Sequence, residues 1–458
     1  MGEPLLGTTA FDLPGTFASR VQRRVDPHDA YLYLLCISLA GYATLGKGFA
    51  YVGYPPLLVG EVTLLLGLVV IYRSGCGLAL LASFPSVLLA GLLSLVVLRT
   101  IPFMGVYGLD AVRDSVIVVY GIFAFVVVAL ILEKPERITW CLKNYGRFAW
   151  VYGLVGASLT YICTGLNDIL PVWPISGVPV VYLRLGEAAV HLSGVAIFML
   201  LGLRRVSLLW TLLLLVNLAM ITLSRGAMVA TVISIGTAVL LGNQLRRLAP
   251  VLLFGAAILG FSYVTRIEVP LWAGDRTIGA QQIVDNVVSI IGKSDAANLD
   301  GTKEWRLRWW RAIEDYTFNG PYFWTGKGFG MGLAEEDGFV VGKEKGTPIV
   351  RSPHNAQYTI LARTGVPGLV LWVTVNLAWL IMMFRQSIAA RRSGDIEWAN
   401  VFVWIACYEL AILVDASFDV ALEGPMLGIW FWSLFGFGIA SMMVYRWDKK
   451  NGVRRQLV

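Results

Sequence analysis

The residues RSPHNAQYTILARTGVPGLVLWVTVNLAWL, numbers 351–380, mark the point where a long polar segment ends and an apolar run begins. The polar segment reaches back to about residue 265, and the other long blocks of the sequence are apolar. Because an apolar helix of roughly 20 residues can cross about 30 Å of hydrocarbon, we interpret the apolar blocks as membrane spans. Residues 265–360 are then the one sizeable water-facing part of the protein.

The composition of the chain supports this interpretation. It has 458 residues, of which 57% are hydrophobic and 15% charged, and its mean hydropathy is +0.68. Such values lie outside the range of soluble domains and are typical of a polytopic membrane protein. The predicted fold class is all-α, with about 12 transmembrane helices and one long, partly helical extracytoplasmic loop.

The apolar blocks predict where the spans lie. They fall near residues 31–50, 56–72, 77–98, 114–132, 147–165, 187–203, 207–223, 226–242, 249–264, 361–384, 399–417 and 425–445. Nine spans therefore occupy residues 1–264, and three occupy residues 361–458. The first thirty residues include arginines but no apolar core, so we expect no cleavable signal ahead of the first span.

Basic residues collect in alternate connections between these spans. Because such residues mark the cytoplasmic side of short loops, we place both termini and the following groups there: Arg20/Arg23/Arg24, Arg73, Lys134/Arg137/Lys143, Arg204/Arg205, Arg246/Arg247, Arg385/Arg391/Arg392 and Arg446/Lys449/Lys450/Arg454/Arg455. The short connections on the other side hold fewer, namely Lys47, Arg99, Arg113, Arg184 and Arg225. The net charge of +7 thus reports orientation, and we expect no nucleic-acid partner.

The long outer segment contains two stretches of helical periodicity. Residues 276–293 and 302–318 both place apolar side chains at helical spacing, and the second carries tryptophans and arginines, which suit a membrane interface. Asn319-Gly320-Pro321 ends the second stretch, and the glycines of 326–330 predict a flexible turn. We expect a partly helical lid over the bundle rather than a separate domain.

Arg225 lies between two apolar runs with almost no loop around it. An arginine so close to hydrocarbon costs a few kcal/mol unless it reaches the interface or binds an anion. One interpretation is a snorkelling side chain without further role. The other is an anion clamp at the N-terminus of the next helix, where free amides and the helix dipole also favour negative charge.

The chain has three histidines, and His354 is the best placed for chemistry. His28 lies in the predicted cytoplasmic segment, and His191 lies within a predicted span beside Glu187, where a structural pair and a proton relay are both open. His354 lies in a polar turn on the outer side, and imidazole titrates near neutral pH. A structural role for a single turn histidine remains the alternative.

Several signatures are missing from the sequence. There is no Asp-x-Asp, no phosphate-binding glycine loop ending in Gly-Lys-Ser/Thr, no Gly-x-Ser-x-Gly and no His-Glu-x-x-His. The five cysteines are single, which argues against a disulfide framework and a zinc site. We therefore expect neither a metal nor a cofactor.

A set of motifs in a fixed order resembles the O-antigen ligase and O-antigen polymerase superfamily. The set comprises Ser224-Arg225-Gly226 between adjacent spans, Arg306-x-x-x-Trp310 and Gly326-x-Gly328 in the long loop, Pro353-His354-Asn355, and Thr364-Gly365-Val366-Pro367-Gly368. The motifs cover about residues 205–385, and the rest of the chain agrees only in hydropathy and span count.

The resemblance implies a multi-pass glycosyltransferase of the GT-C type in the bacterial inner membrane, with its active site facing the periplasm. Such enzymes take a glycan from undecaprenyl diphosphate; ligases pass it to lipid A–core oligosaccharide, and polymerases pass it to another lipid-linked repeat. The resemblance implies that Arg225 and Arg306 grip the diphosphate and that His354 acts near the acceptor hydroxyl. Further candidates around these positions are Asn355, Arg308, Arg311 and Arg351. Arg113-Asp114 and Glu187 with His191 match no motif of the superfamily.

The same residue types suit this chemistry on physical grounds. A departing diphosphate needs stabilised charge, which guanidinium forks supply without a metal, and a sugar hydroxyl needs a base such as imidazole. Attack opposite the leaving group would invert the anomeric carbon. A transporter of polyprenyl-linked glycans is the rival interpretation, but transporters show related halves and polar residues at mid-span, and the sequence has no internal repeat. A scaffold without activity leaves Arg225 and His354 without a role.

Overall fold

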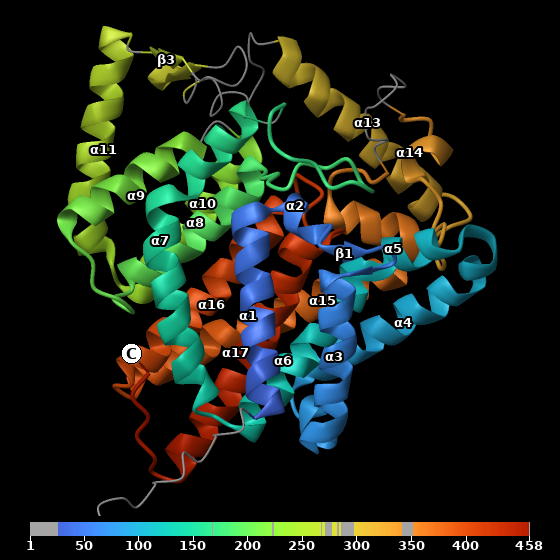
Figure 1. Cartoon of the computed structure of the whole chain (residues 1–458), viewed down its shortest axis with the longest axis horizontal. Helices are drawn as coiled ribbons and strands as arrows, with labels where there is room; N and C mark the ends of the chain where they lie inside the picture. Colours follow the sequence, from blue (N-terminus) through green and yellow to red (C-terminus); the bar gives the residue numbers. More distant parts are fainter. Residues whose placement is uncertain are drawn as a thin grey trace, which may run out of the picture.

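A computed structural model gives the structure of the protein and describes residues 26–166, 168–221, 224–266, 268–270, 277–281, 284, 297–340 and 351–457. The chain is mostly helical, and its described strands form two short antiparallel pairs (Figure 1). The first half contains α1 (Pro27–Leu45), α2 (Lys47–Ala50), β1 (Gly53–Tyr54), β2 (Leu57–Leu58), α3 (Val59–Ser74), the 3-10 turn η1 (Gly77–Leu81), α4 (Phe84–Tyr107), α5 (Leu109–Val119), α6 (Ile122–Glu133), α7 (Arg137–Gly165), α8 (Leu185–Leu200) and α9 (Leu208–Ile221).

The second half continues the helical bundle and adds the outer segment. It contains α10 (Arg225–Gly242), α11 (Leu245–Thr265), β3 (Glu268–Pro270), β4 (Thr277–Gly279), α13 (Ala297–Phe318), α14 (Leu333–Glu336), α15 (Ala356–Arg392), α16 (Ile396–Asp415) and α17 (Pro425–Lys450). The helix expected over 302–318 is present as α13 and ends at the predicted residue, Phe318.

The described helices make this a multi-pass membrane protein. By length and composition, six of them could cross a membrane, and a seventh candidate is the bent pair α5 and α6, whose axes meet at 46°. Each of the twelve apolar ranges expected from sequence overlaps one of the described helices, but several of these helices are too short or too polar for that test. The count of twelve spans therefore stays a prediction.

Helices α16 and α17 form the centre of the bundle. In α17, 94% of the most apolar window is buried, and in α16 the share is 78%, against 22% for α4 at the edge. Nearly every residue of α8 is buried as well. A helix that is surrounded by other helices has apolar side chains on all its faces, unlike a surface helix. The sequences of α8, α16 and α17 are accordingly apolar over most of their length. The tryptophans of α17 donate to backbone carbonyls of neighbouring segments, Trp430 to Leu39 and Trp432 to Ile117.

The polar ends of the helices gather at two opposite ends of the bundle (Figure 1). At one end the start of α1 meets the start of α7 and the C-terminal residues, through ion pairs such as Lys134 with Asp29 and Arg455 with Glu136. At the other end lie α13, the start of α15 and the segment 166–184. The basic groups expected on the cytoplasmic side include Lys134, Arg137 and Arg455, which share the first end. That this end faces the cytoplasm remains a prediction.

Helix α15 is broken at Gly365, which has φ +71° and ψ −169°. Pro367 lacks an amide hydrogen, so the carbonyl of Arg363 has no helical partner there. That carbonyl accepts the amide of Gly328 instead, and the carbonyl of Ala362 accepts the amide of Lys327. The outer segment is thereby hydrogen-bonded to the first part of α15, directly behind the turn that carries His354.

One expected helix is wrong at its start. Residues 277–279 of the stretch 276–293 form strand β4, which pairs with β3, and most of the remaining positions lie outside the described residues. Thr277 and Ile278 are β-branched and have a complementary strand beside them, which favours extended structure over a helix.

Candidate active site at the outer end of the bundle

The loop 416–424, between α16 and α17, joins the separate motifs in space. The carboxylate of Asp419 pairs with His354, and the carbonyl of Phe418 accepts a hydrogen bond from Arg306. The side chain of Phe418 packs so closely on Gly226 that a Cβ there would lie 3.0 Å from it. Motifs that are up to about 130 residues apart in the chain therefore meet on one loop.

His354 forms a dyad with Asp419. Its Nδ1 lies 3.1 Å from Asp419 Oδ1, and its side chain is 23% exposed. Because an ionised carboxylate can only accept, Nδ1 carries the proton of the neutral imidazole. Nε2 has no hydrogen-bond partner among the described residues, so its lone pair is available for a substrate proton.

The charge state of Asp419 supports this assignment. Burial raises the pKa of this carboxyl, but the His354 hydrogen bond, the Arg184 charge and the Val420 amide together lower it to about 2. The amide of Val420 donates to it at 2.7 Å, and Arg184 Nη1 lies 4.0 Å away. Asp419 is therefore ionised throughout the neutral range.

The backbone of His354 is held in an uncommon conformation. Its φ is +54°, in the left-handed region that costs a non-glycine residue roughly 1–2 kcal/mol. The residues on both sides are fixed: the carbonyl of Pro353 accepts the Trp310 indole at 2.9 Å, and Asn355 caps α15. Neighbouring contacts thus impose the conformation, which turns the imidazole towards Asp419 and brings it against the Trp305 ring, 6.2 Å between centroids.

Asn355 binds the protein backbone through both the oxygen and the nitrogen of its side-chain amide. Its Oδ1 accepts the amides of Gln357 and Tyr358, at 2.9 and 3.2 Å, and its Nδ2 donates to Ser417 at 2.9 Å. Such a cap is worth about 1 kcal/mol to a helix. The geometry therefore gives Asn355 an anchoring position between α15 and the loop 416–424.

Arg306 is half-buried on the face of α13 that looks onto this loop. One terminal nitrogen donates to the Phe418 carbonyl, while its buried Nε has no hydrogen-bond partner in the part of the chain that the structure describes. Burial lowers the pKa of this guanidinium, the nearby Asp419 carboxylate opposes that effect, and the charge of Arg225 adds to it. Arg225 and Arg306 therefore lie within electrostatic range of each other, although they come from different helices.

Arg225 is the first residue of α10, preceded by Ser224 as its N-cap. The first amides of a helix lack intrahelical partners and favour anions. A guanidinium at this position adds a full charge to them, so α10 begins with the chemistry of an anion site beside Arg306.

Arg308 and Arg311 lie on the opposite face of α13. Both are exposed, whereas Trp309 between them is fully buried, with its indole bonded to Asp337 at 2.7 Å. Of the three arginines of this helix, the fold directs Arg306 to the loop 416–424.

Arg351 is committed to a separate cluster around Asp114. Asp114 Oδ2 lies 3.2 Å from Arg351 and 2.9 Å from Arg363, which is 2% exposed, and it accepts the amide of Gly330. Arg351 also donates to the Gly330 carbonyl at 2.8 Å. These contacts tie α5 to the turn that carries His354, and they give Asp114, which matched no motif, a structural position.

The glycines of 326–330 allow this packing. At Gly328 a Cβ would lie 2.1 Å from the Phe103 ring, and at Gly330 it would lie 2.5 Å from Tyr107; both glycines also have positive φ. Any side chain at these two positions would displace the end of α4 and with it the Asp114 cluster.

A model of the O-antigen ligase family matches residues 210–373. The match spans most of α9, then α10, α11, the outer segment and the first half of α15, and it supports the resemblance to the O-antigen ligase and polymerase superfamily. Arg225, Arg306 and His354 all lie inside it, whereas Asp419 lies outside. No curated protein shows significant similarity to the chain.

Sequence reasoning missed the loop 416–424, although it held a signal. Asp415, Asp419 and Glu423 recur every fourth residue next to a predicted outer helix end, where charge is costly. Glu423 accepts the Thr359 hydroxyl at 3.0 Å, and its other oxygen is buried with no hydrogen-bond partner among the residues that the structure describes. Burial raises the pKa of Glu423 to about 7.

The other two histidines lie elsewhere. His191 is buried in α8 and bonds through Nδ1 to the Tyr408 hydroxyl at 2.6 Å, rather than pairing with Glu187. His28 pairs with Glu133 at the opposite end of the bundle. Of the three histidines, His354 is the one at the loop 416–424.

Proposed function

We propose that the protein is a membrane glycosyltransferase that moves a saccharide from undecaprenyl diphosphate to an acceptor glycan or glycolipid on the extracytoplasmic face, as an O-antigen ligase does. The single observation that carries the proposal is the convergence of His354, Arg306 and the start of α10 on the loop 416–424. It unites a base with an anion site, the two parts that transfer from a diphosphate requires.

In the proposed reaction the acceptor hydroxyl gives its proton to His354 Nε2 while its oxygen bonds to the anomeric carbon. The bond from that carbon to the diphosphate oxygen breaks, and the electron pair leaves with undecaprenyl diphosphate. Asp419 stabilises the imidazolium that forms, as a carboxylate partner does in other base-orienting pairs. Attack from the side opposite the diphosphate inverts the anomeric configuration.

The arginines act on the leaving group. Arg225 and Arg306 face the developing negative charge with fixed donors, and such preorganised donors are worth most in a site that excludes water. The unpartnered Nε of Arg306 supports this role, because a buried donor without an acceptor costs free energy until a ligand supplies one. The anion charge would be neutralised by side chains, so the proposed mechanism needs no metal.

A reconstituted transfer assay tests the proposal. His354→Ala should lower the transfer rate by about 100- to 10,000-fold, the range expected for a lost general base. Binding of the lipid-linked donor should persist, because the arginines hold the diphosphate. Transfer at the wild-type rate, or equal loss of donor binding and of folded protein, would remove His354 from the mechanism.

The acceptor is identified in cells. In a deletion strain, loss of long chains from the outer lipid with accumulation of lipid-linked polymer would indicate a ligase. Accumulation of single lipid-linked repeats would indicate a polymerase with the same catalytic parts.

A further inference from the structure

A groove of about 800 Å³ lies at the end of the bundle opposite the His354 site, between α4, α15 and α17. Its wall includes Phe84, Leu377 and Ile381, which are apolar and exposed on the outside of the bundle. In a membrane protein, such a surface faces lipid tails. The groove therefore offers space for a hydrocarbon chain.

Two arginines, Arg385 of α15 and Arg446 of α17, line the same groove. Both are exposed, and neither has a carboxylate oxygen within 4.0 Å among the described residues. Arg446 donates its Nε to Gln386 Oε1 at 3.0 Å, which fixes the stem and leaves the terminal nitrogens of the guanidinium for another acceptor. No acidic side chain is found among the described residues that line the groove. Two uncompensated guanidinium groups beside an apolar wall match the chemistry of an anionic lipid.

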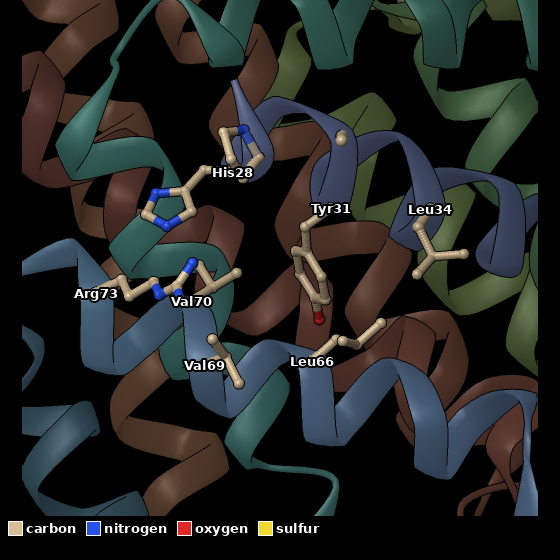
Figure 2. A pocket seen from close by; sticks show the side chains of 9 residues that line it. His28, Tyr31, Leu34, Leu66, Val69, Val70 and Arg73 are labelled. Carbon is tan, nitrogen blue, oxygen red and sulfur yellow. The ribbon is translucent and has the colours of Figure 1, made fainter. Parts of the chain in front are cut away.

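A second groove at the same end of the bundle differs in its charge (Figure 2). It lies between α1 and α3, has about 370 Å³, and places His28 and Arg73 at one end and Leu34 and Leu66 further along. Here the histidine is bonded to Glu133, at 2.8 Å. Negative charge is already present at this groove, so it has less need of an anionic ligand.

We propose that the groove between α4, α15 and α17 binds an anionic phospholipid of the bilayer. The phosphate lies between Arg385 and Arg446, and an acyl chain follows Phe84, Leu377 and Ile381. Basic pockets between membrane helices are suited to anionic head groups, and forked guanidinium groups hold phosphate bidentately. This site is separate from the proposed catalytic centre, so its test does not depend on transferase activity.

Lipid retention by the purified, full-length protein tests the proposal. The protein in detergent is incubated with dioleoyl phosphatidylglycerol or dioleoyl phosphatidylcholine, and bound lipid is counted by native mass spectrometry. Wild-type protein should retain phosphatidylglycerol in preference to phosphatidylcholine. The double variant Arg385→Gln/Arg446→Gln should bind phosphatidylglycerol roughly 10- to 30-fold more weakly. The estimate assigns about 1 kcal/mol of attraction to each arginine, and about 1.4 kcal/mol corresponds to a factor of ten in affinity.

A matched control removes the same charge elsewhere at this end. Arg73→Gln/Arg147→Gln also deletes two exposed arginines and should retain phosphatidylglycerol as the wild type does. Ala378→Trp, which fills the groove but keeps both charges, should reduce retention as well. Both test variants change side chains that line the groove and should unfold at the wild-type temperature in phosphatidylcholine.

Three results would overturn the proposal. They are equal retention of the two lipids by the wild type, equal loss in the control variant, and a loss in the test variant that follows its loss of folded protein. Retention of undecaprenyl phosphate in place of phosphatidylglycerol would overturn the assignment of the occupant. Lysine at both positions keeps the charge but loses the planar fork, so it should recover only part of the retention.

Discussion

Asp114 and Asp419 lie at the same end of the bundle, and both accept from basic side chains, yet their surroundings differ. Asp114 is 8% exposed and pairs with Arg351 and Arg363. Asp419 is 35% exposed, pairs with His354, and has an arginine, Arg184, only at 4.0 Å. The first carboxylate is surrounded by permanent charges, and the second faces a group that can gain and lose a proton.

This difference indicates a structural role for Asp114 and a role in proton transfer for the pair that Asp419 forms with His354. An arginine cannot give up its proton in a protein, so the Asp114 cluster is a fixed joint between α5, the 326–330 loop and α15. The His354–Asp419 pair changes its net charge when a proton arrives at Nε2.

The largest effect should come from Asp114→Asn. The change leaves the buried Arg363 guanidinium, 2% exposed, without a compensating charge, which should lower the free energy of unfolding by about 3–5 kcal/mol. Thermal unfolding in detergent and the yield of folded protein measure it. Asp110→Asn, at a carboxylate that is 46% exposed, is the control and should cost below about 1 kcal/mol. A stable Asp114→Asn protein that has lost transfer would place Asp114 among the reacting groups.

Arg306→Lys should act on turnover rather than on stability. A lysine offers one point charge where a planar fork is needed, so the transition state should lose about 2–4 kcal/mol, on the scale of one oxyanion donor. Arg225→Lys should behave in the same way. Because Arg308 and Arg311 are exposed on the other face of α13, their lysine variants should keep the wild-type rate. Full transfer by Arg306→Lys would remove this residue from the anion site.

The sequence predicted the parts of this site but not their assembly. Arg225 could be chosen because an arginine next to hydrocarbon is costly unless it reaches the interface or binds an anion, and His354 because it lies in a polar turn of the predicted outer segment. Arg306 follows from the family resemblance alone, whereas α13 follows from the helical periodicity of residues 302–318. Asp419 could not be paired with His354, because 65 residues and a complete helix hairpin separate them and only tertiary packing joins them. The positive φ of His354 likewise depends on contacts made on both sides of it.

Hydropathy does not show where a candidate span is bent. Residues 114–132 read as one apolar block, whereas α5 and α6 are separate helices that meet at 46° near Gly121. The bend is not visible in hydropathy, because residues 115–132 contain no charged residue and run through it without a break. Asp114 lies in α5, the first of these two helices, and its carboxylate pairs with Arg363.

Asp419→Asn should lower the transfer rate by about 10- to 100-fold while the protein stays folded, because an amide can no longer stabilise the imidazolium that His354 forms. The decrease should appear in kcat more than in the affinity for the donor, since the diphosphate is held by arginines. Initial rates over a range of donor concentrations measure both. An unchanged kcat would mean that Asp419 orients a structural histidine, and the contrast with Asp114 would disappear.

The smallest effect should be a slope in stability that belongs to Glu423. Burial raises the pKa of Glu423 from 4.5 to about 7, so the folded protein holds a proton that the unfolded chain has already lost. This contribution to stability is complete below pH 4.5 and is lost as the pH rises through 7. Asp419 behaves in the opposite sense: its pKa is lowered from 3.8 to about 2, so its contribution is present above pH 3.8 and is lost only towards pH 2. Between pH 5 and 8, therefore, the contribution of Glu423 to stability changes, while that of Asp419 does not.

The free energy of unfolding of the wild type, minus that of Glu423→Gln, should fall on the order of 1–2 kcal/mol across this range, because glutamine keeps the Thr359 contact but does not titrate. Equal slopes in the two proteins would show that Glu423 is ionised in the fold and that the loop 416–424 is more hydrated than its burial indicates.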